Sequence, residues 1–209
     1  MKFIRFLHRW IGLISGLIVM ISCLTGVVIL IGKLIGSYAP IFKWSQKLHT
    51  SLFLSDTGRE IIGIATLLLI IEIITGLIIW WQVAKARIKA ARLRNRSAFH
   101  GIRKSLSWNT PYAPFGLHLA GGVWCTVPLL IMALTGLTWS FGWFGSFVYS
   151  IFDQEGNGDL FHSIVFLHTG SFWGNISRIL WLVAALIASS LPLTGLLLYL
   201  NSKKTSHRK

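Results

Sequence analysis

The sequence predicts an all-α integral membrane protein, a four-transmembrane-helix bundle built from a duplicated two-helix repeat. Three observations lead to this prediction. Hydrophobic residues make up 54% of the 209-residue chain and charged residues only 12%, against about 25% charged residues in an ordinary soluble domain. Four apolar stretches are long enough to cross a bilayer. Histidines and Thr-Gly pairs recur at matching intervals in the two halves of the chain.

The apolar stretches cover approximately residues 8–32, 60–82, 118–142 and 178–200. Each provides roughly the 20 residues that a helix needs to cross about 30 Å of hydrocarbon. The first stretch follows three basic residues, as the apolar core of a signal peptide would. It is too long for such a core, however, and no small-residue cleavage pattern follows it. We therefore expect a retained first helix.

The basic residues predict the orientation of these helices. The N-terminus is basic, segment 83–110 carries eight Lys or Arg residues and no acid, and four more follow Leu200. Cytoplasmic loops are enriched in Lys and Arg, so these segments and both termini are expected in the cytoplasm. Loop 143–167 has no Lys or Arg and is expected outside. The net charge of +14 is thus explained by membrane orientation, and no nucleic-acid partner is expected.

The repeat is defined by four histidines. His8 and His118 each precede a Thr-Gly pair by 17 positions, whereas His49 and His168 each precede one by 26. A parallel two-helix repeat implies a pseudo-twofold axis along the membrane normal, which brings equivalent residues together. The repeat divides the chain into a first two-helix unit, a basic cytoplasmic linker and a second two-helix unit, at residues 1–97, 98–117 and 118–209.

These four histidines are the candidate cofactor ligands. His8 and His118 are expected near the cytoplasmic face, and His49 and His168 near the outer face. Two imidazoles at each level suit a bis-histidine haem, which a helix bundle can hold between facing helices. Copper or zinc could also use paired imidazoles, but no Cys, Asp or Glu recurs in register with them. We therefore predict haem b, with one or two haems per chain.

The longer spacing predicts where the outer pair lies. A helix rises about 1.5 Å per residue, so 26 positions span about 39 Å and 17 positions about 26 Å. We expect His49 and His168 to project to the membrane surface or past it, on helix extensions or short interfacial segments. The Thr-Gly pairs fit either close passage of a flat macrocycle or ordinary small-residue helix packing.

Glu72 is the only acid in the interior of a predicted span, since Glu60 stands at the first position of its span, and the counterpart of Glu72 in the second repeat is Leu191. A charge at the middle of a membrane helix costs roughly 2.5 kcal/mol or more, so such residues are functional candidates. Three roles are open for Glu72: movement of a proton, contact with a quinone, or a hydrogen bond made in the protonated form.

Two charged segments are candidate contact sites. Asp153, Glu155 and Asp159 lie in a Gly-rich run and could attract ferric iron, a hard cation suited to oxygen ligands, although their spacing is not that of an EF-hand. A solvated acidic turn is the alternative. The basic segment 83–110 is expected to contact anionic membrane lipid or to dock a cytoplasmic reductase.

The sequence resembles the PepSY-associated transmembrane helix family over nearly its whole length. The resemblance rests on Leu7-His8-Arg9-Trp10-Ile11-Gly12 with Leu24-Thr25-Gly26, Leu48-His49-Thr50 with Ile74-Thr75-Gly76-Leu77, Leu117-His118 with Leu134-Thr135-Gly136-Leu137, and Leu167-His168-Thr169-Gly170 with Leu193-Thr194-Gly195-Leu196. It implies a haem-containing reductase of ferric iron or ferric siderophores in the bacterial inner membrane, working with iron uptake. The chain has no room for an extracytoplasmic PepSY domain or a fused flavin domain, so free or weakly chelated ferric iron is the simpler expected substrate.

We therefore expect a ferric reductase that carries electrons from the cytoplasmic side or the quinol pool to ferric iron at the periplasmic face. No nicotinamide or flavin fingerprint is present, so a cytoplasmic flavin reductase or membrane quinol is expected as the donor. A non-enzymatic membrane scaffold or regulator is the alternative. A metal-ion transporter is less favoured, because such sites usually lie at the membrane midplane. A homodimer is left open.

Overall fold

The structure, a computed structural model, describes residues 1–37, 39–153 and 159–206. These residues form eight helices and no strand. The helices are α1 (Lys2–Ile35), α2 (Pro40–Ser51), α3 (Ser55–Arg92), α4 (Ala98–Ser105), α5 (Ala113–Ser140), α6 (Gly142–Phe152), α7 (Asp159–Thr169) and α8 (Asn175–Ser206).

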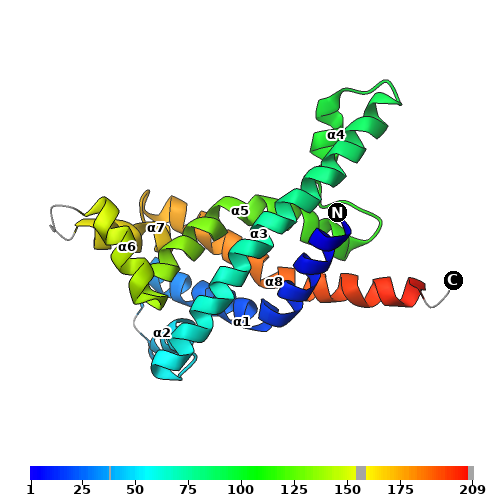
Figure 1. Cartoon of the computed structure of the whole chain (residues 1–209). Coiled ribbons are helices and arrows are strands. Elements are labelled where there is room, and N and C mark those ends of the chain that lie inside the picture. Colours follow the sequence, from blue (N-terminus) through cyan, green and yellow to red (C-terminus); the bar gives the residue numbers. More distant parts are fainter. Residues whose placement is uncertain (38, 154–158, 207–209) are drawn as a thin grey trace.

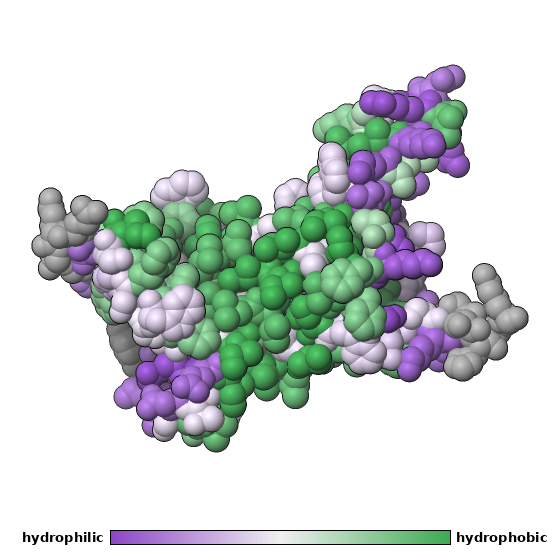
Figure 2. All heavy atoms as spheres, in the orientation of Figure 1, coloured by the Kyte–Doolittle hydropathy of each residue, from purple (hydrophilic) through white to green (hydrophobic). Residues whose placement is uncertain are grey.

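In the described part of the chain, four helices are long and apolar enough to cross a membrane, namely α1, α3, α5 and α8. Only 17–33% of the residues in their most apolar windows are buried inside the protein, so most of this apolar surface faces outward. A surrounding of lipid explains such exposure, because lipid tails are as apolar as the side chains. Figure 2 shows apolar residues over the middle of the bundle and hydrophilic residues toward its ends and on a projecting segment.

The four long helices extend beyond the approximate predicted spans at every end but one. α5 stops at Ser140, two residues before the end of the predicted span 118–142, and Phe141 has an extended backbone with φ −123° and ψ 115°. A new helix, α6, then begins at Gly142. The residues on both sides of this break are apolar, so hydropathy gives no signal of it.

The four long helices pack in a ring. α1 contacts α3 and α8, and α5 contacts the same two helices. α1 and α5 therefore lie diagonally across the bundle from each other (Figure 1). A buried apolar cluster joins α5 to α8 and comprises Cys125, Leu129, Ala184 and Ala188.

At one end of the bundle the chain folds back on itself. α1 ends at Gly36, whose φ of 63° is left-handed, a conformation that glycine adopts without steric cost. α2 then packs against α1 and α3, and α7 packs against α5. A Cβ atom on Gly32 would lie 2.6 Å from the Phe42 ring, so glycine is needed for α2 to pack this closely on α1.

The other end, here called the basic end, holds the start of α1 and the end of α8 (Figure 1). Arg9 of α1 lies over the Tyr199 ring of α8, 5.5 Å from its centroid. The last turns of α3 extend beyond the bundle with α4 packed against them (Figure 1). This projection, residues 83–110, is called the basic arm. The Trp80 indole N–H donates to the Ser105 carbonyl at 3.2 Å and so ties the arm to the bundle.

The contact between α3 and α5 depends on Gly63, since a Cβ atom there would lie 2.7 Å from the Phe141 ring and 2.9 Å from Cβ of Ser140. Overpacking of such a contact costs about 1–3 kcal/mol. We therefore expect Gly63→Ile to lower the thermal unfolding midpoint of the purified protein. The matched control is Ile64→Phe, because Ile64 is 54% exposed and should tolerate a larger side chain. Equal midpoints for the two variants would contradict the close contact.

Candidate functional site

The four histidines singled out by the sequence lie in two facing pairs. The ring centroids of His8 on α1 and His118 on α5 are 6.0 Å apart. Those of His49 on α2 and His168 on α7 are 6.2 Å apart. With metal–nitrogen bonds of about 2.0 Å, two imidazoles on opposite sides of one ion have centroids about 6 Å apart. Both pairs have the spacing of two ligands to a single metal.

Each histidine is held by the threonine of a Thr-Gly pair on another helix. The contact joins the ring Nδ1 to the threonine Oγ1 in all four cases. Its length is 3.0 Å for His8 and Thr75, 3.1 Å for His49 and Thr25, 3.0 Å for His118 and Thr194, and 2.9 Å for His168 and Thr135. All four threonines are buried. These contacts connect α3 to α1, α2 to α1, α8 to α5, and α7 to α5.

The direction of these hydrogen bonds follows from the threonines. Each hydroxyl donates its own proton to the carbonyl four residues earlier in its helix, as Thr75 does to Ile71 at 2.8 Å and Thr135 does to Ile131 at 2.6 Å; Thr25 and Thr194 do the same. With its proton donated there, the hydroxyl accepts from the histidine, and Nδ1 then carries the hydrogen. Nε2 is left with a lone pair, in the neutral form of imidazole that binds metals.

Two backbone carbonyls reinforce this tautomer. The Ser22 carbonyl accepts from His49 Nδ1 at 2.9 Å, and the Leu191 carbonyl accepts from His118 Nδ1 at 3.1 Å. A carbonyl oxygen has no hydrogen to donate, so it too requires a proton on Nδ1. Hydrogen bonds of this kind orient the ring of a metal-ligating histidine and fix its tautomer.

The glycine of each Thr-Gly pair makes room for the same ring. A Cβ atom on Gly26, Gly76, Gly136 or Gly195 would lie 3.3–3.5 Å from Cε1 of the histidine that the adjacent threonine holds. Sequence reasoning did not find this role, because it requires knowing which helix faces each histidine. The available signal was the same Thr-Gly pair at matched spacing in both halves of the chain.

The outer pair lies on two short helices, α2 and α7, as one of the two predicted arrangements has it. His49 reaches Thr25, which is ten residues before the end of α1, or about 15 Å of helix. His168 likewise reaches Thr135, five residues before the end of α5. The pair lies alongside the long helices and not past their ends, because α2 and α7 are separate short helices that fold back.

The pair at the basic end opens into a cavity of about 440 Å³, within the usual range for ligand and cofactor sites of roughly 300–1,000 Å³. His8, His118 and Glu72 line it, and its walls are mainly apolar. Gly122 also lines the cavity, and a Cβ atom there would meet nothing within 4 Å. The cavity therefore has free space beside His118.

Glu72 is part of this site. Its Oε2 lies 3.1 Å from Nδ1 of His8, and its Oε1 is buried without a hydrogen-bond partner. A Cβ atom on Gly12 would lie 3.1 Å from Oε2, so the absence of a side chain on α1 leaves space for the carboxyl group. The acid that breaks the sequence repeat thus lies against one of the predicted ligands.

The family model of the PepSY-associated TM region matches residues 30–159, more than half of the chain. The protein belongs to this family. The matched residues include His49, His118, Thr75 and Thr135, which contribute to both histidine pairs. No curated protein and no solved structure matches the chain. With four apolar helices, this member of the PepSY-associated TM family is a multi-pass membrane protein.

The two described acids of the acidic run, Asp153 and Asp159, lie at the end of the bundle opposite the basic end, beside α6 and α7 (Figure 1). Asp153 follows the last residue of α6, and Asp159 begins α7. Glu155 lies outside the described residues. Among the residues that the structure describes, no group of three or more His, Cys, Asp or Glu side chains could hold a metal ion. Attraction of ferric iron by this run stays a prediction.

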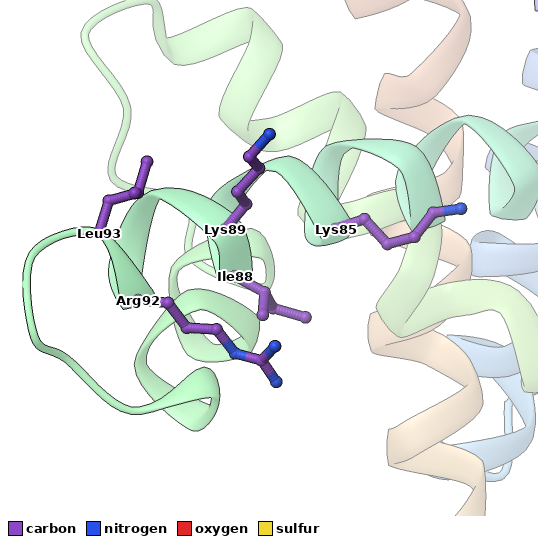
Figure 3. A pocket seen from close by; sticks show the side chains of 5 residues that line it. All are labelled: Lys85, Ile88, Lys89, Arg92 and Leu93. Carbon is purple, nitrogen blue, oxygen red and sulfur yellow. The ribbon is translucent and has the colours of Figure 1, made fainter.

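The basic arm carries an open cavity of about 510 Å³ near the end of α3. Figure 3 shows the five side chains that line it, Lys85, Ile88, Lys89, Arg92 and Leu93. Leu93 is 79% exposed, so the arm combines positive charge with accessible apolar surface. Anionic lipid head groups fit such a surface, as does an acidic protein.

Proposed function

We propose that this protein is a haem b oxidoreductase of the bacterial inner membrane, a ferric reductase that supports iron uptake. Electrons would enter from the cytoplasmic side and reduce ferric iron, free or chelated, at the periplasmic face. One observation carries the proposal. Two histidine pairs lie at two levels of a membrane bundle, each with the spacing of two ligands to one metal and each with Nδ1 hydrogen-bonded so that Nε2 is available.

The residues of both sites fit haem better than a bare metal ion. A structural zinc site takes four protein ligands, but the described part of the chain offers no group of three or more ligating side chains. Haem supplies four nitrogen ligands of its own, so His8 with His118, or His49 with His168, would hold it without a further protein ligand. The mainly apolar cavity of about 440 Å³ beside His8 and His118 suits the flat apolar body of a porphyrin.

When bound, haem supplies the one-electron chemistry of its iron. The chain orients the ligands and excludes water. Thr75 and Thr194 hold the two histidines of one pair, and Thr25 and Thr135 hold the two of the other. The buried cluster around Cys125 and Leu129 lies along α5 between His118 and Thr135, so apolar packing separates the two levels.

The positive-inside rule supports the proposed direction, because it assigns the basic end to the cytoplasm. His8 and His118 would then form the inner site and His49 and His168 the outer site. A soluble flavin reductase could deliver electrons at the basic arm, or quinol could deliver them from the membrane. The apolar layer between the levels argues against a transporter, which needs a polar path for its ion.

Haem content per chain is the first test, measured by the pyridine haemochromogen assay. We expect about two haems in the wild type, one for each histidine pair. His118→Ala and His49→Ala should each remove one of them. His162→Ala is the control, since His162 is an exposed histidine outside both pairs. A wild-type protein without haem would refute the proposal, and loss in His118→Ala alone would restrict it to the inner site.

Thr135 is expected to affect haem affinity without touching the iron. Its hydroxyl accepts the Nδ1 hydrogen of His168, and loss of such a partner typically weakens metal binding about 10–100-fold. Thr135→Val should therefore release the outer haem to apomyoglobin faster than the wild type does. The control is Thr138→Val, because that hydroxyl donates only within α5, to the Thr135 carbonyl at 2.7 Å. Equal release rates in the two variants would argue against the anchoring role.

Ferric reduction is tested with the protein oriented in vesicles that enclose a ferrous chelator. NADH, FMN and a soluble flavin reductase are supplied at the face bearing the basic arm, and ferric citrate is supplied inside. Electrostatic steering raises association rates about tenfold or more. We therefore expect a triple variant of the basic arm to form ferrous iron more slowly by about that factor at low salt. The variant combines Lys85→Glu, Lys89→Glu and Arg92→Glu. Lys43→Glu with Lys47→Glu on α2 is the control at the other end. An unchanged rate would show that the basic arm does not dock the flavin reductase.

A further inference from the structure

All four histidines contact a threonine on another helix, but the surroundings of His8 differ from those of the other three. Three positions before each anchoring threonine stand Ser22, Glu72, Met132 and Leu191. Of these four residues, only Glu72 brings a carboxyl group to the ring, with Oε2 at 3.1 Å from Nδ1 of His8. Its counterpart Leu191 provides only its backbone carbonyl to His118.

The helix packed against Glu72 is adapted to it. Gly12 faces the carboxyl group, and a Cβ atom there would lie 3.1 Å from Oε2. The equivalent glycine in the second half is Gly122, 110 positions later, where a Cβ atom would meet nothing within 4 Å. The first half thus places a carboxyl group in a space that stays open in the second half.

A carboxylate partner raises the basicity of a metal-ligating histidine more than a hydroxyl or a carbonyl partner does. A histidine that donates its second N–H to a carboxylate becomes a more basic ligand, and a more basic ligand stabilises the oxidised metal. In the outer pair, the structure gives each histidine a backbone carbonyl and a threonine hydroxyl as partners: Ser22 and Thr25 for His49, and Met132 and Thr135 for His168.

We propose that Glu72 is a positioning residue that makes the inner site the more strongly reducing of the two. The inference rests on the proposed haem function. Each transfer between the sites would oxidise the inner site by one electron and reduce the outer site by one electron. Reduced flavin or quinol restores the inner electron, and ferric iron removes the outer one. A lower inner potential makes this transfer favourable toward the ferric substrate.

The test is a potentiometric titration of the haem absorbance at constant pH. In the His49→Ala background, which retains only the inner site, Glu72→Gln should shift the oxidised-to-reduced ratio about tenfold toward the reduced form, or about 59 mV for a one-electron couple. Glu60→Gln is the control, because Glu60 is an exposed acid on the same helix and should leave the potential unchanged. Haem bound with an unchanged potential in Glu72→Gln would overturn this inference and leave the proposed function intact.

A second variant keeps the test decisive if Glu72→Gln loses the inner haem. The double variant Glu72→Leu with Leu191→Glu moves the carboxyl group from His8 to His118, the other histidine of the same pair. An inner-site potential as low as that of the wild type in this double variant supports the inference. An inner-site potential equal to that of Glu72→Leu alone refutes it. An inner potential above the outer one in the wild type would also refute it. Absence of haem from the wild type would instead refute the proposed function.

Discussion

One hydrogen bond, from a histidine Nδ1 to a threonine hydroxyl on another helix, determines both the packing and the chemistry of this bundle. It occurs four times, at 2.9–3.1 Å. Because each threonine gives its own proton to its helix, the bond has one direction and leaves Nε2 of every histidine with a lone pair. Because donor and acceptor lie on different helices, the same bond also fixes which helices adjoin, as where Thr75 brings α3 against His8 of α1.

The sequence predicted which histidines face each other but not what holds them. Equivalent positions of a parallel repeat meet across the bundle axis, so His8 was expected opposite His118. The sequence did not reveal which threonine holds His8. The Thr-Gly pair that follows His8 contains Thr25, which lies on the same helix, whereas the ring contacts Thr75, 67 positions away. Only the packing of α1 on α3 reveals that partner. The contact of His49 with Thr25 was hidden for a similar reason, since counting residues along one helix does not reveal the reversal at Gly36.

Hydropathy predicted four spanning helices because a membrane leaves the backbone few alternatives to the helix. It could not predict how far the helices extend. α3 continues to Arg92 through several basic residues, and α4 packs on these last turns. A Cβ atom on Gly101 would lie 2.6 Å from Cα of Ile88, so the two helices approach closely there. In the basic arm, α3 therefore continues through residues that are not apolar, and there it packs against α4.

Two sites of identical structure would have the same affinity for an electron, and transfer between them would have no preferred direction. Any direction must then come from differences between the halves. Two differences lie beside the histidines: Glu72 stands where the other half has Leu191, and the Trp139 ring lies 5.1 Å from that of His168. A carboxylate that accepts from a metal-ligating histidine makes it a more basic ligand, whereas an aromatic ring adds apolar surface beside the outer histidine. Under the proposed function, both differences would lower the inner potential relative to the outer one and would give electron transfer between the two sites one direction.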